Sequence, residues 1–276
     1  MLKINPTRRL LPILLLLLFC PLAGAQEYRI LITNDDGVDS PLLAELKLQL
    51  EALPDTEVVV SAPDANQSGS SHASIGAEFE VTRVMRDGEF FGYSVSGRPA
   101  DAVRYALLTL GSEEPFDLVV SGINLGANVG DVSHLSGTVG AAMEAQYHGI
   151  PSIAVSQATS EVNTRESARF AARVVEKLRR DGPLPGVVLS INIPGGVLKG
   201  VRVRPVGDSY LQTEGYEELS VQGDRMAVRR IRTIATSEDR VTDTYAYQNG
   251  YITITPLKFD WTAYELIPEV ESWDLE

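Results

Sequence analysis

The chain has 276 residues, of which 44% are hydrophobic and 22% charged, a balance typical of a soluble protein with one large α/β domain or two small ones. Its formal net charge of −13 argues against binding to nucleic-acid duplexes, because duplex binders display basic patches. Cys20, the only cysteine, lies in the leader described next, so the mature chain offers no disulfide, thiol nucleophile or zinc–cysteine site.

The first 25 residues predict a cleaved signal peptide. A positive region over residues 3–9 precedes the apolar segment Leu10–Phe19, and Ala23–Ala25 forms a small-residue cleavage site. The apolar segment is short for a bilayer span, so we expect cleavage near Ala25 and a periplasmic or secreted protein without a stable membrane anchor. An uncleaved anchor is the alternative. Arg8-Arg9 weakly resembles a twin-arginine signal, and the export route stays open.

The first predicted strand ends in two adjacent carboxylates. The apolar run Ile30–Ile32 stops at Thr33-Asn34-Asp35-Asp36-Gly37, and a helix follows with Ser40 as its N-cap and Pro41 at its first position. Adjacent carboxylates at the tip of a buried strand repel each other, and a divalent cation with oxygen ligands compensates them. The alternative is an ordinary turn with solvated side chains, since turns also favour Asn, Asp and Gly.

The elements that follow predict a mostly parallel sheet. A helix over Ser40–Leu53 and a strand over Glu57–Val60 complete a β-α-β unit, which we expect to be parallel and right-handed. Residues 77–95 read as a hairpin that turns at Asp87-Gly88 and lies beside the main sheet. The later elements alternate between helix and strand: a helix opened by Ser96–Asp101, strands Asp117–Ser121, Pro151–Ser156 and Val187–Ile191, and helices Val139–His148 and Glu161–Arg180.

From about Gly200 the sequence becomes strand-like, with segments at 201–204, 226–230 and 251–255. We interpret residues 26–198 as the α/β core and residues 199–276 as a β-rich C-terminal extension, an arm that packs on a partner subunit.

Three polar loops follow the predicted strands that end at Ile32, Val60 and Ser121. They are Asn34–Gly37, Asp64–His72 and Gly122–Thr138. The carboxyl ends of parallel strands share one edge of a sheet, where ligands bind. The helix start Ser136-Gly137-Thr138 offers free N–H groups and a positive dipole end. Together these features predict a phosphate-binding site. Neither a G-x-G-x-x-G nor a Walker A pattern is present, so a dinucleotide or P-loop nucleotide site lacks its motif.

These segments resemble the SurE-type survival-protein nucleotidases. The matching blocks are Ile30–Ser40, Ala62-Pro63-Asp64 followed by Ser68, Gly97–Asp101, Asp117–Val139, Leu189–Pro194 and Gly250–Leu257. The resemblance covers nearly all of the mature chain, in order and with compatible spacing. Arg98 stands where the family commonly has a small residue, and its role stays open.

The resemblance implies an α/β fold: a three-layer α/β/α, Rossmann-like, mostly parallel sheet with a β-rich C-terminal extension. It also implies a divalent-metal phosphomonoesterase acting on nucleoside 5′-monophosphates, assembled as a homodimer or homotetramer. The metal ligands would be Asp35, Asp36, Ser68 and Asn124. An oxygen-rich set of this kind suits one Mg²⁺ or Mn²⁺ ion per subunit.

Other residues of these loops would have further roles in phosphate-ester hydrolysis. The amides of Ser136, Gly137 and Thr138 would hold phosphate oxygens, and His134 would stabilise the transition state or protonate the leaving oxygen. A structural role for His134 is the equal alternative, and we expect His72 and His148 to be structural. Direct attack by water is favoured over a phosphoenzyme on Asp36, but both stay open. Hydrolysis of 3′-nucleotides or polyphosphate, or an exported nucleotide-binding module without turnover, are the alternative functions.

Overall fold

The computed structural model describes residues 27–76, 78–208 and 210–275. The predicted signal peptide, residues 1–25, lies outside the described residues. Within the described ranges, no helix has the length and apolar character needed to cross a bilayer.

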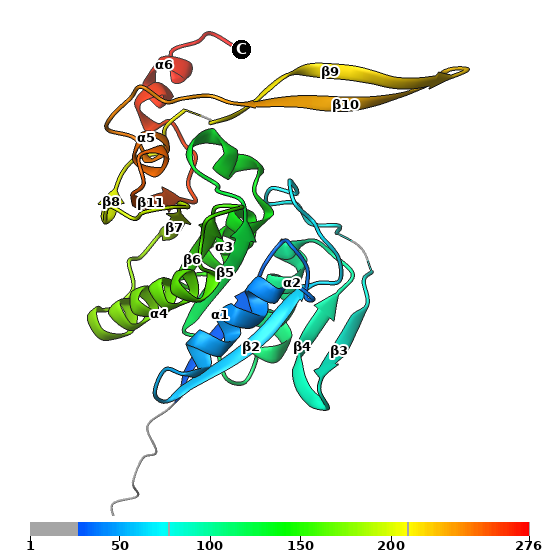
Figure 1. The fold of residues 1–276 in the computed structure, drawn as a ribbon. Coiled ribbons are helices and arrows are strands. Elements are labelled where there is room, and N and C mark those ends of the chain that lie inside the picture. The colour runs from blue at the N-terminus through cyan, green and yellow to red at the C-terminus, as the bar shows by residue number, and fades with distance from the viewer. Residues whose placement is uncertain (1–26, 77, 209, 276) are drawn as a thin grey trace, which may run out of the picture.

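The body of the molecule is built on a nine-stranded sheet with the order β3-β4-β2-β1-β5-β6-β7-β11-β8 (Figure 1). All neighbours from β4 to β7 are parallel, whereas β3 pairs antiparallel with β4 and β11 pairs antiparallel with β7. The strands are β1 (Tyr28–Thr33), β2 (Thr56–Pro63), β3 (Val81–Arg86), β4 (Glu89–Val95), β5 (Leu118–Leu125), β6 (Ser152–Gln157), β7 (Val187–Ile193), β8 (Val201–Val203) and β11 (Ile252–Lys258).

Helices cover both faces of this sheet. They are α1 (Pro41–Glu51), α2 (Pro99–Tyr105, continued by a π-helical turn over Ala106–Leu110), α3 (Gly137–Tyr147, preceded by a 3-10 turn over Gly130–Leu135), α4 (Thr164–Asp181) and the short α5 (Asp243–Gln248). Successive residues of a strand point to opposite faces. Ile30 and Ile32 therefore pack with α1 and α4, whereas Leu31 packs with α2 and α3. The predicted three-layer α/β/α architecture is confirmed.

Two predicted elements differ from the structure. The hairpin β3-β4 does not lie beside the main sheet but extends it, because β4 pairs in parallel with the last residues of β2, Ser61–Pro63. The strand predicted to end at Ser121 continues to Leu125, so the first residues of the expected loop Gly122–Thr138 belong to β5. The pairing of β5 with β6 shifts register between Ser121 and Asn124.

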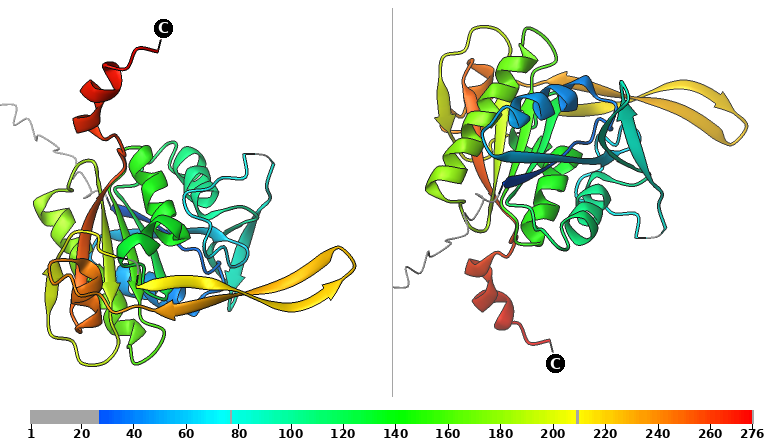
Figure 2. Two further views of the ribbon diagram at one scale, coloured as in Figure 1. Left: turned by 90° about the horizontal axis from the view of Figure 1, so that it is seen from above. Right: turned by 90° about the horizontal axis from the view of Figure 1, so that it is seen from below.

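The C-terminal extension has one strand pair apart from the main sheet. Strands β9 (Leu211–Gln222) and β10 (Arg225–Ile234) pair antiparallel with each other and form a two-stranded arm. Figure 2 shows this arm and the C-terminal helix α6 (Ile267–Glu271) projecting from the body in different directions. The expected β-rich extension is thus present, while β9, α5 and α6 were not predicted.

Candidate metal and phosphate site

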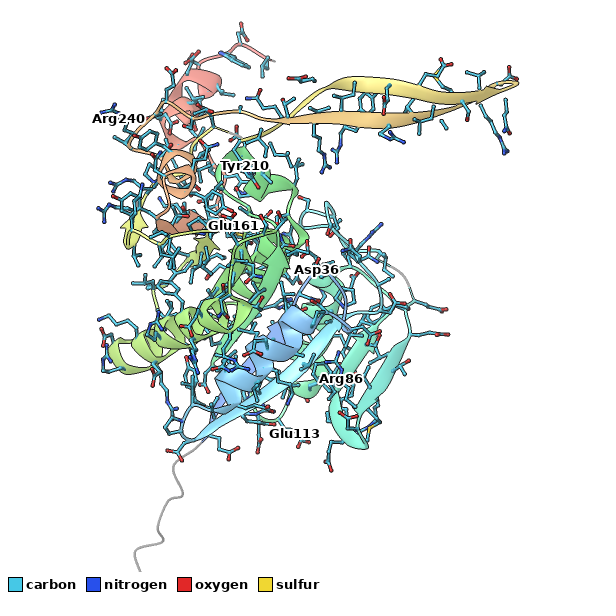
Figure 3. The ribbon with its side chains drawn as sticks, in the orientation of Figure 1. Asp36, Arg86, Glu113, Glu161, Tyr210 and Arg240 are labelled. Atoms are coloured by element: carbon cyan, nitrogen blue, oxygen red, sulfur yellow. The ribbon has the colours of Figure 1, made fainter. Side chains whose placement is uncertain are left out.

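The candidate site lies at the carboxyl end of β1. Figure 3 labels Asp36 there, and Glu113, which precedes β5, lies toward the opposite edge of the sheet. The turn that follows β1 is closed by Asn34, whose side chain donates to the carbonyl of Gly37 at 2.9 Å and accepts from its amide at 3.2 Å. Asn34 thus shapes the turn that presents the two carboxylates.

Asp35 is buried, with 2% of its surface exposed, and faces the start of α3. Its Oδ1 accepts a hydrogen bond from the hydroxyl of Thr138 at 2.5 Å. Burial raises the pKa of the Asp35 carboxyl, while the hydroxyl of Thr138 and the amides of Thr138 and Gly137 act to lower it, and the net direction is upward. The positive end of the α3 dipole also favours a negative charge here.

Asp36 is half-buried and binds two neighbouring loops. Its Oδ2 accepts from the backbone amide of Leu125 at 3.2 Å, and its Oδ1 accepts from the side chain of Asn66 at 3.3 Å. Burial and the charge of Asp35 raise the pKa of the Asp36 carboxyl to about 6. Within the described residues, no Lys, Arg or His pairs with either carboxylate. Two adjacent carboxylates without a cationic partner fit a divalent cation.

Ser68 and Asn124 are linked to the two carboxylates by contacts of the residues next to them in the sequence. The amide of Gln67 donates to the carbonyl of Asp35 at 2.7 Å, which ties the loop carrying Ser68 to the end of β1. Asn124 directly precedes Leu125, the residue whose amide binds Asp36. The side-chain amide of Asn124 donates to the carbonyl of Gly126 at 2.6 Å, which leaves its side-chain oxygen to accept or coordinate. The loops that carry Ser68 and Asn124 therefore contact Asp35 and Asp36, and ligation of one cation by the oxygens of all four residues stays a prediction.

The predicted phosphate-binding site, Ser136–Thr138, lies against Asp35. Ser136 caps α3 by accepting from the amide of Val139 at 3.1 Å, and the hydroxyl of Thr138 is engaged with Asp35. A Cβ at Gly137 would stand 2.8 Å from the Cβ of Asp35, so glycine allows this close approach. In this structure the helix start faces a carboxylate of the chain itself, and its binding of phosphate stays a prediction.

His134 lies in the 3-10 turn that precedes α3. Its carbonyl accepts from the hydroxyl of Ser71 at 2.6 Å, and its exposed ring meets Trp261 edge-on with 6.3 Å between ring centres. Both rings line a cavity of about 250 Å³ that also reaches Ser136 and Lys258. No described contact joins His134 to Asp35 or Asp36, so its catalytic role stays a prediction.

The other two histidines and Arg98 have partners in the chain. His72 and His148 both bind the buried carboxylate of Glu144, at 2.6 and 3.0 Å, in agreement with the structural roles expected for them. The guanidinium of Arg98 donates to the side chain of Gln67, and its backbone amide donates to Asp101 at 2.9 Å. Arg98 therefore contacts the loop that carries Ser68.

Sequence reasoning missed two side chains at this edge. Asn66 binds Asp36, and the hydroxyl of Ser70 is buried, without a hydrogen-bond partner among the described residues, and lies 2.6 Å from the position of a Cβ on Gly137. Both belong to the polar loop Asp64–His72, whose hydroxyl-rich composition was the available signal.

The comparisons with known proteins point to one family. The family model described as "Survival protein SurE" matches residues 30–213. A protein named 5'-nucleotidase SurE from Syntrophobacter fumaroxidans is 36% identical over 252 residues, which is 90% of this chain and 100% of its own. The 5'-nucleotidase SurE 1 of Thermus thermophilus is 39% identical over 242 residues, 86% of this chain and 94% of its own.

Solved structures give the same result. The crystal structure of the SurE protein from Aquifex aeolicus matches with a TM-score of 0.76 and 31% sequence identity, over 88% of this chain and 98% of that chain. Because the family model spans more than half of this chain and the relatives are matched over almost their whole length, the chain belongs to the SurE family.

Proposed function

We propose that this protein is a phosphomonoesterase that hydrolyses nucleoside 5′-monophosphates to nucleoside and phosphate, with one divalent cation, Mg²⁺ or Mn²⁺, per subunit. The observation that carries the proposal is the pair of adjacent carboxylates, Asp35 and Asp36, without a cationic partner among the described residues. The relatives named 5'-nucleotidase SurE supply the substrate class. Hydrolysis of 3′-nucleotides or polyphosphate would use the same centre and differ only in what the neighbouring cavity admits.

In this proposal the chain's residues have distinct roles. Asp35 and Asp36 hold the cation, and the oxygens of Ser68 and Asn124 complete its protein ligands. The bound cation would supply Lewis acidity toward phosphoryl oxygen and water. The N-terminus of α3 favours negative charge at the phosphoryl group. His134, which lines the cavity, would donate a proton to the leaving oxygen.

Phosphate release across a panel of phosphoesters tests the proposal, with Mg²⁺, Mn²⁺ or EDTA in the assay. We expect hydrolysis of nucleoside 5′-monophosphates to require the metal and to fall more than about 100-fold in Asp36→Asn. Asp39→Asn is the matched control, because Asp39 is an exposed carboxylate three residues further along the same turn and should leave activity unchanged. Equal hydrolysis with and without EDTA would contradict the proposal. Tight nucleotide binding without phosphate release would instead identify a binding module.

We further propose that residues 1–25 are removed on export. The charged start, the apolar segment and the small-residue site support this interpretation. Intact mass of the protein recovered from the exported fraction should correspond to a chain that begins at Gln26. A mass that retains the leader would point to an uncleaved anchor.

We also propose that the chain forms a homodimer or homotetramer through its C-terminal extension. The arm β9–β10 and helix α6 expose apolar side chains away from the body, as Val228, Ile231 and Val270 illustrate with 50%, 41% and 46% exposure. A two-stranded hairpin is marginally stable by itself in water, so burial against a second subunit would stabilise it.

A further inference from the structure

A second buried carboxylate, Glu144 on α3, gathers three basic side chains away from the metal and phosphate site. Glu144 is fully buried, at 0% exposure. His72 contacts its Oε2 at 2.6 Å, Arg104 donates to its Oε1 at 2.7 Å, and His148 contacts Oε1 at 3.0 Å. These partners come from the loop after β2, from α2 and from the residue that caps the C-terminus of α3. Glu144 therefore joins three segments of the chain.

The charge of Glu144 is maintained by these partners. Burial raises the pKa of its carboxyl, but the hydrogen bonds and charges of His72 and Arg104 outweigh burial and lower the pKa to about 2. A buried charge that loses one of its partners is costly. The contact with His72 therefore restrains the loop more firmly than a surface ion pair would.

The loop is anchored again just after His72. Ser74 donates to Asp101 at 2.5 Å and accepts from Arg104 at 3.1 Å, and the amide of Ile75 donates to Asp101 at 3.1 Å. Arg104 thus contacts both Glu144 and the loop. This end of the loop is held by charged side chains of α2 and α3.

At its other end the same loop meets the metal and phosphate site. The amide of Gln67 donates to the carbonyl of Asp35 at 2.7 Å. Between the two anchors the loop lies directly on α3, because a Cβ at Gly140 would stand 2.0 Å from the carbonyl oxygen of Ser71. Ser68 lies between these attachments, with its side chain exposed. The position of Ser68 relative to Asp35 and Asp36 therefore depends on how the loop is held.

We propose that Glu144 is a positioning residue, which binds His72 and Arg104 and thereby fixes the loop so that Ser68 reaches the metal held by Asp35 and Asp36. This inference rests on the proposed function. It assigns a role to a side chain that contacts neither the metal ligands nor the cavity that we associate with the substrate.

Equilibrium binding of Mn²⁺ alone, followed by the electron paramagnetic resonance of the free ion, tests the inference without substrate. We expect His72→Ala and Glu144→Gln to weaken Mn²⁺ binding about 10-fold or more. His148→Ala is the matched control, because it removes a contact to the same carboxylate from the C-cap of α3 and leaves the loop anchored. It should bind Mn²⁺ within about twofold of the wild type. His72→Gln keeps a donor for Glu144 and should recover most of the affinity.

A kinetic measurement separates positioning from a general loss of structure. At saturating Mn²⁺, Glu144→Gln should regain the wild-type kcat, because the loop ligand is displaced and not removed and Glu144, unlike His72, does not line the cavity. Wild-type Mn²⁺ affinity in both His72→Ala and Glu144→Gln would overturn the inference, as would a low kcat that excess Mn²⁺ does not restore. If the wild type binds Mn²⁺ and the variants bind it weakly, the inference stands even where no phosphate is released, so its failure and that of the proposed function are distinguishable.

Discussion

Asp35 and Asp36 are adjacent in sequence, but they have different surroundings. Asp35 is buried against the N-terminus of α3, whereas Asp36 is half-buried and accepts hydrogen bonds from Asn66 and Leu125. The helix start thus holds one carboxylate in a fixed orientation and leaves the other nearer the surface. In the proposed function, Asp35 sets the geometry of the site and Asp36 completes it.

Thr138→Val tests how far the hydroxyl of Thr138 stabilises Asp35. Valine keeps the shape of the side chain but removes the 2.5 Å hydrogen bond to a buried carboxylate. We expect the free energy of unfolding in EDTA to fall by about 1.5–3 kcal/mol, the usual contribution of a hydrogen bond to a charged group. Urea denaturation measures the change. Thr138→Ser keeps the hydroxyl and serves as the control, and a Val variant as stable as the Ser variant would refute this role.

The sequence allowed the carboxylates to be predicted, but not their partners. Asp35 and Asp36 stand out because they end an apolar strand. The contact between Asp35 and Thr138 joins residues 103 positions apart and depends on how α3 docks on the sheet. The local sequence pattern therefore indicated a free helix N-terminus suited to phosphate. In the folded chain, this helix N-terminus faces Asp35.

At the scale of elements, α3 contributes to two features at once. Its first turn faces Asp35, and two turns later Glu144 binds the loop and α2. Small residues along this helix permit the close packing, as Gly140 does beneath Ser71. The position of the loop after β2 is consequently coupled to that of α3.

Lowering the pH should remove the stabilisation that the charge of Glu144 supplies, over a pH range set by the pKa of its carboxyl. The pKa of Glu144 is lowered from 4.5 to about 2 in the folded protein, so its charge stabilises the fold above about pH 4.5 and this contribution is lost as the pH falls through about 2. The contribution is on the order of 3 kcal/mol. The stability difference between wild type and Glu144→Gln should therefore shrink as the pH is lowered from about 5 to about 2. Denaturation with urea across this range measures it, and a constant difference would contradict the assignment.

Elements with strong periodicity were predicted well, and elements set by tertiary pairing were not. Helix α4 was expected from its regular apolar face and begins three residues later than predicted, after the N-cap Asn163. The hairpin β3-β4 joins the sheet because the edge of β2 was open, which no local pattern reveals. Strand β5 continues past Gly122 because β6 keeps pairing with it after the register shift.

At the scale of the whole molecule, the body and the projecting arm differ in whether their apolar side chains are buried. The body buries its apolar side chains on both faces of the sheet. The arm exposes them, and most of its residues are solvent-accessible. Its mixed, largely polar composition explains why β9 was missed in the sequence, since an arm without a buried face has no alternation to detect.

Oligomer formation through the arm can be tested by light scattering coupled to size-exclusion chromatography. We expect the wild type to have two or four times the mass of one chain, and the double substitution Val228→Asp with Ile231→Asp to reduce it toward one. Both residues are exposed on β10, and charges there would oppose burial against a partner. Leu108→Asp, at an exposed apolar position on the body, is the control. A wild type with the mass of a single chain would exclude this assembly.

The most direct measurement of the central claim is an anomalous diffraction map from crystals soaked in Mn²⁺. We predict one strong peak per chain at the carboxyl end of β1, about 2.0–2.5 Å from carboxylate oxygens of Asp35 and Asp36 and within reach of Asn124 and Ser68. Asp36→Asn crystals treated in the same way should lack the peak. A peak elsewhere in the molecule, or none at saturating Mn²⁺, would contradict the assignment of this pair as the metal site.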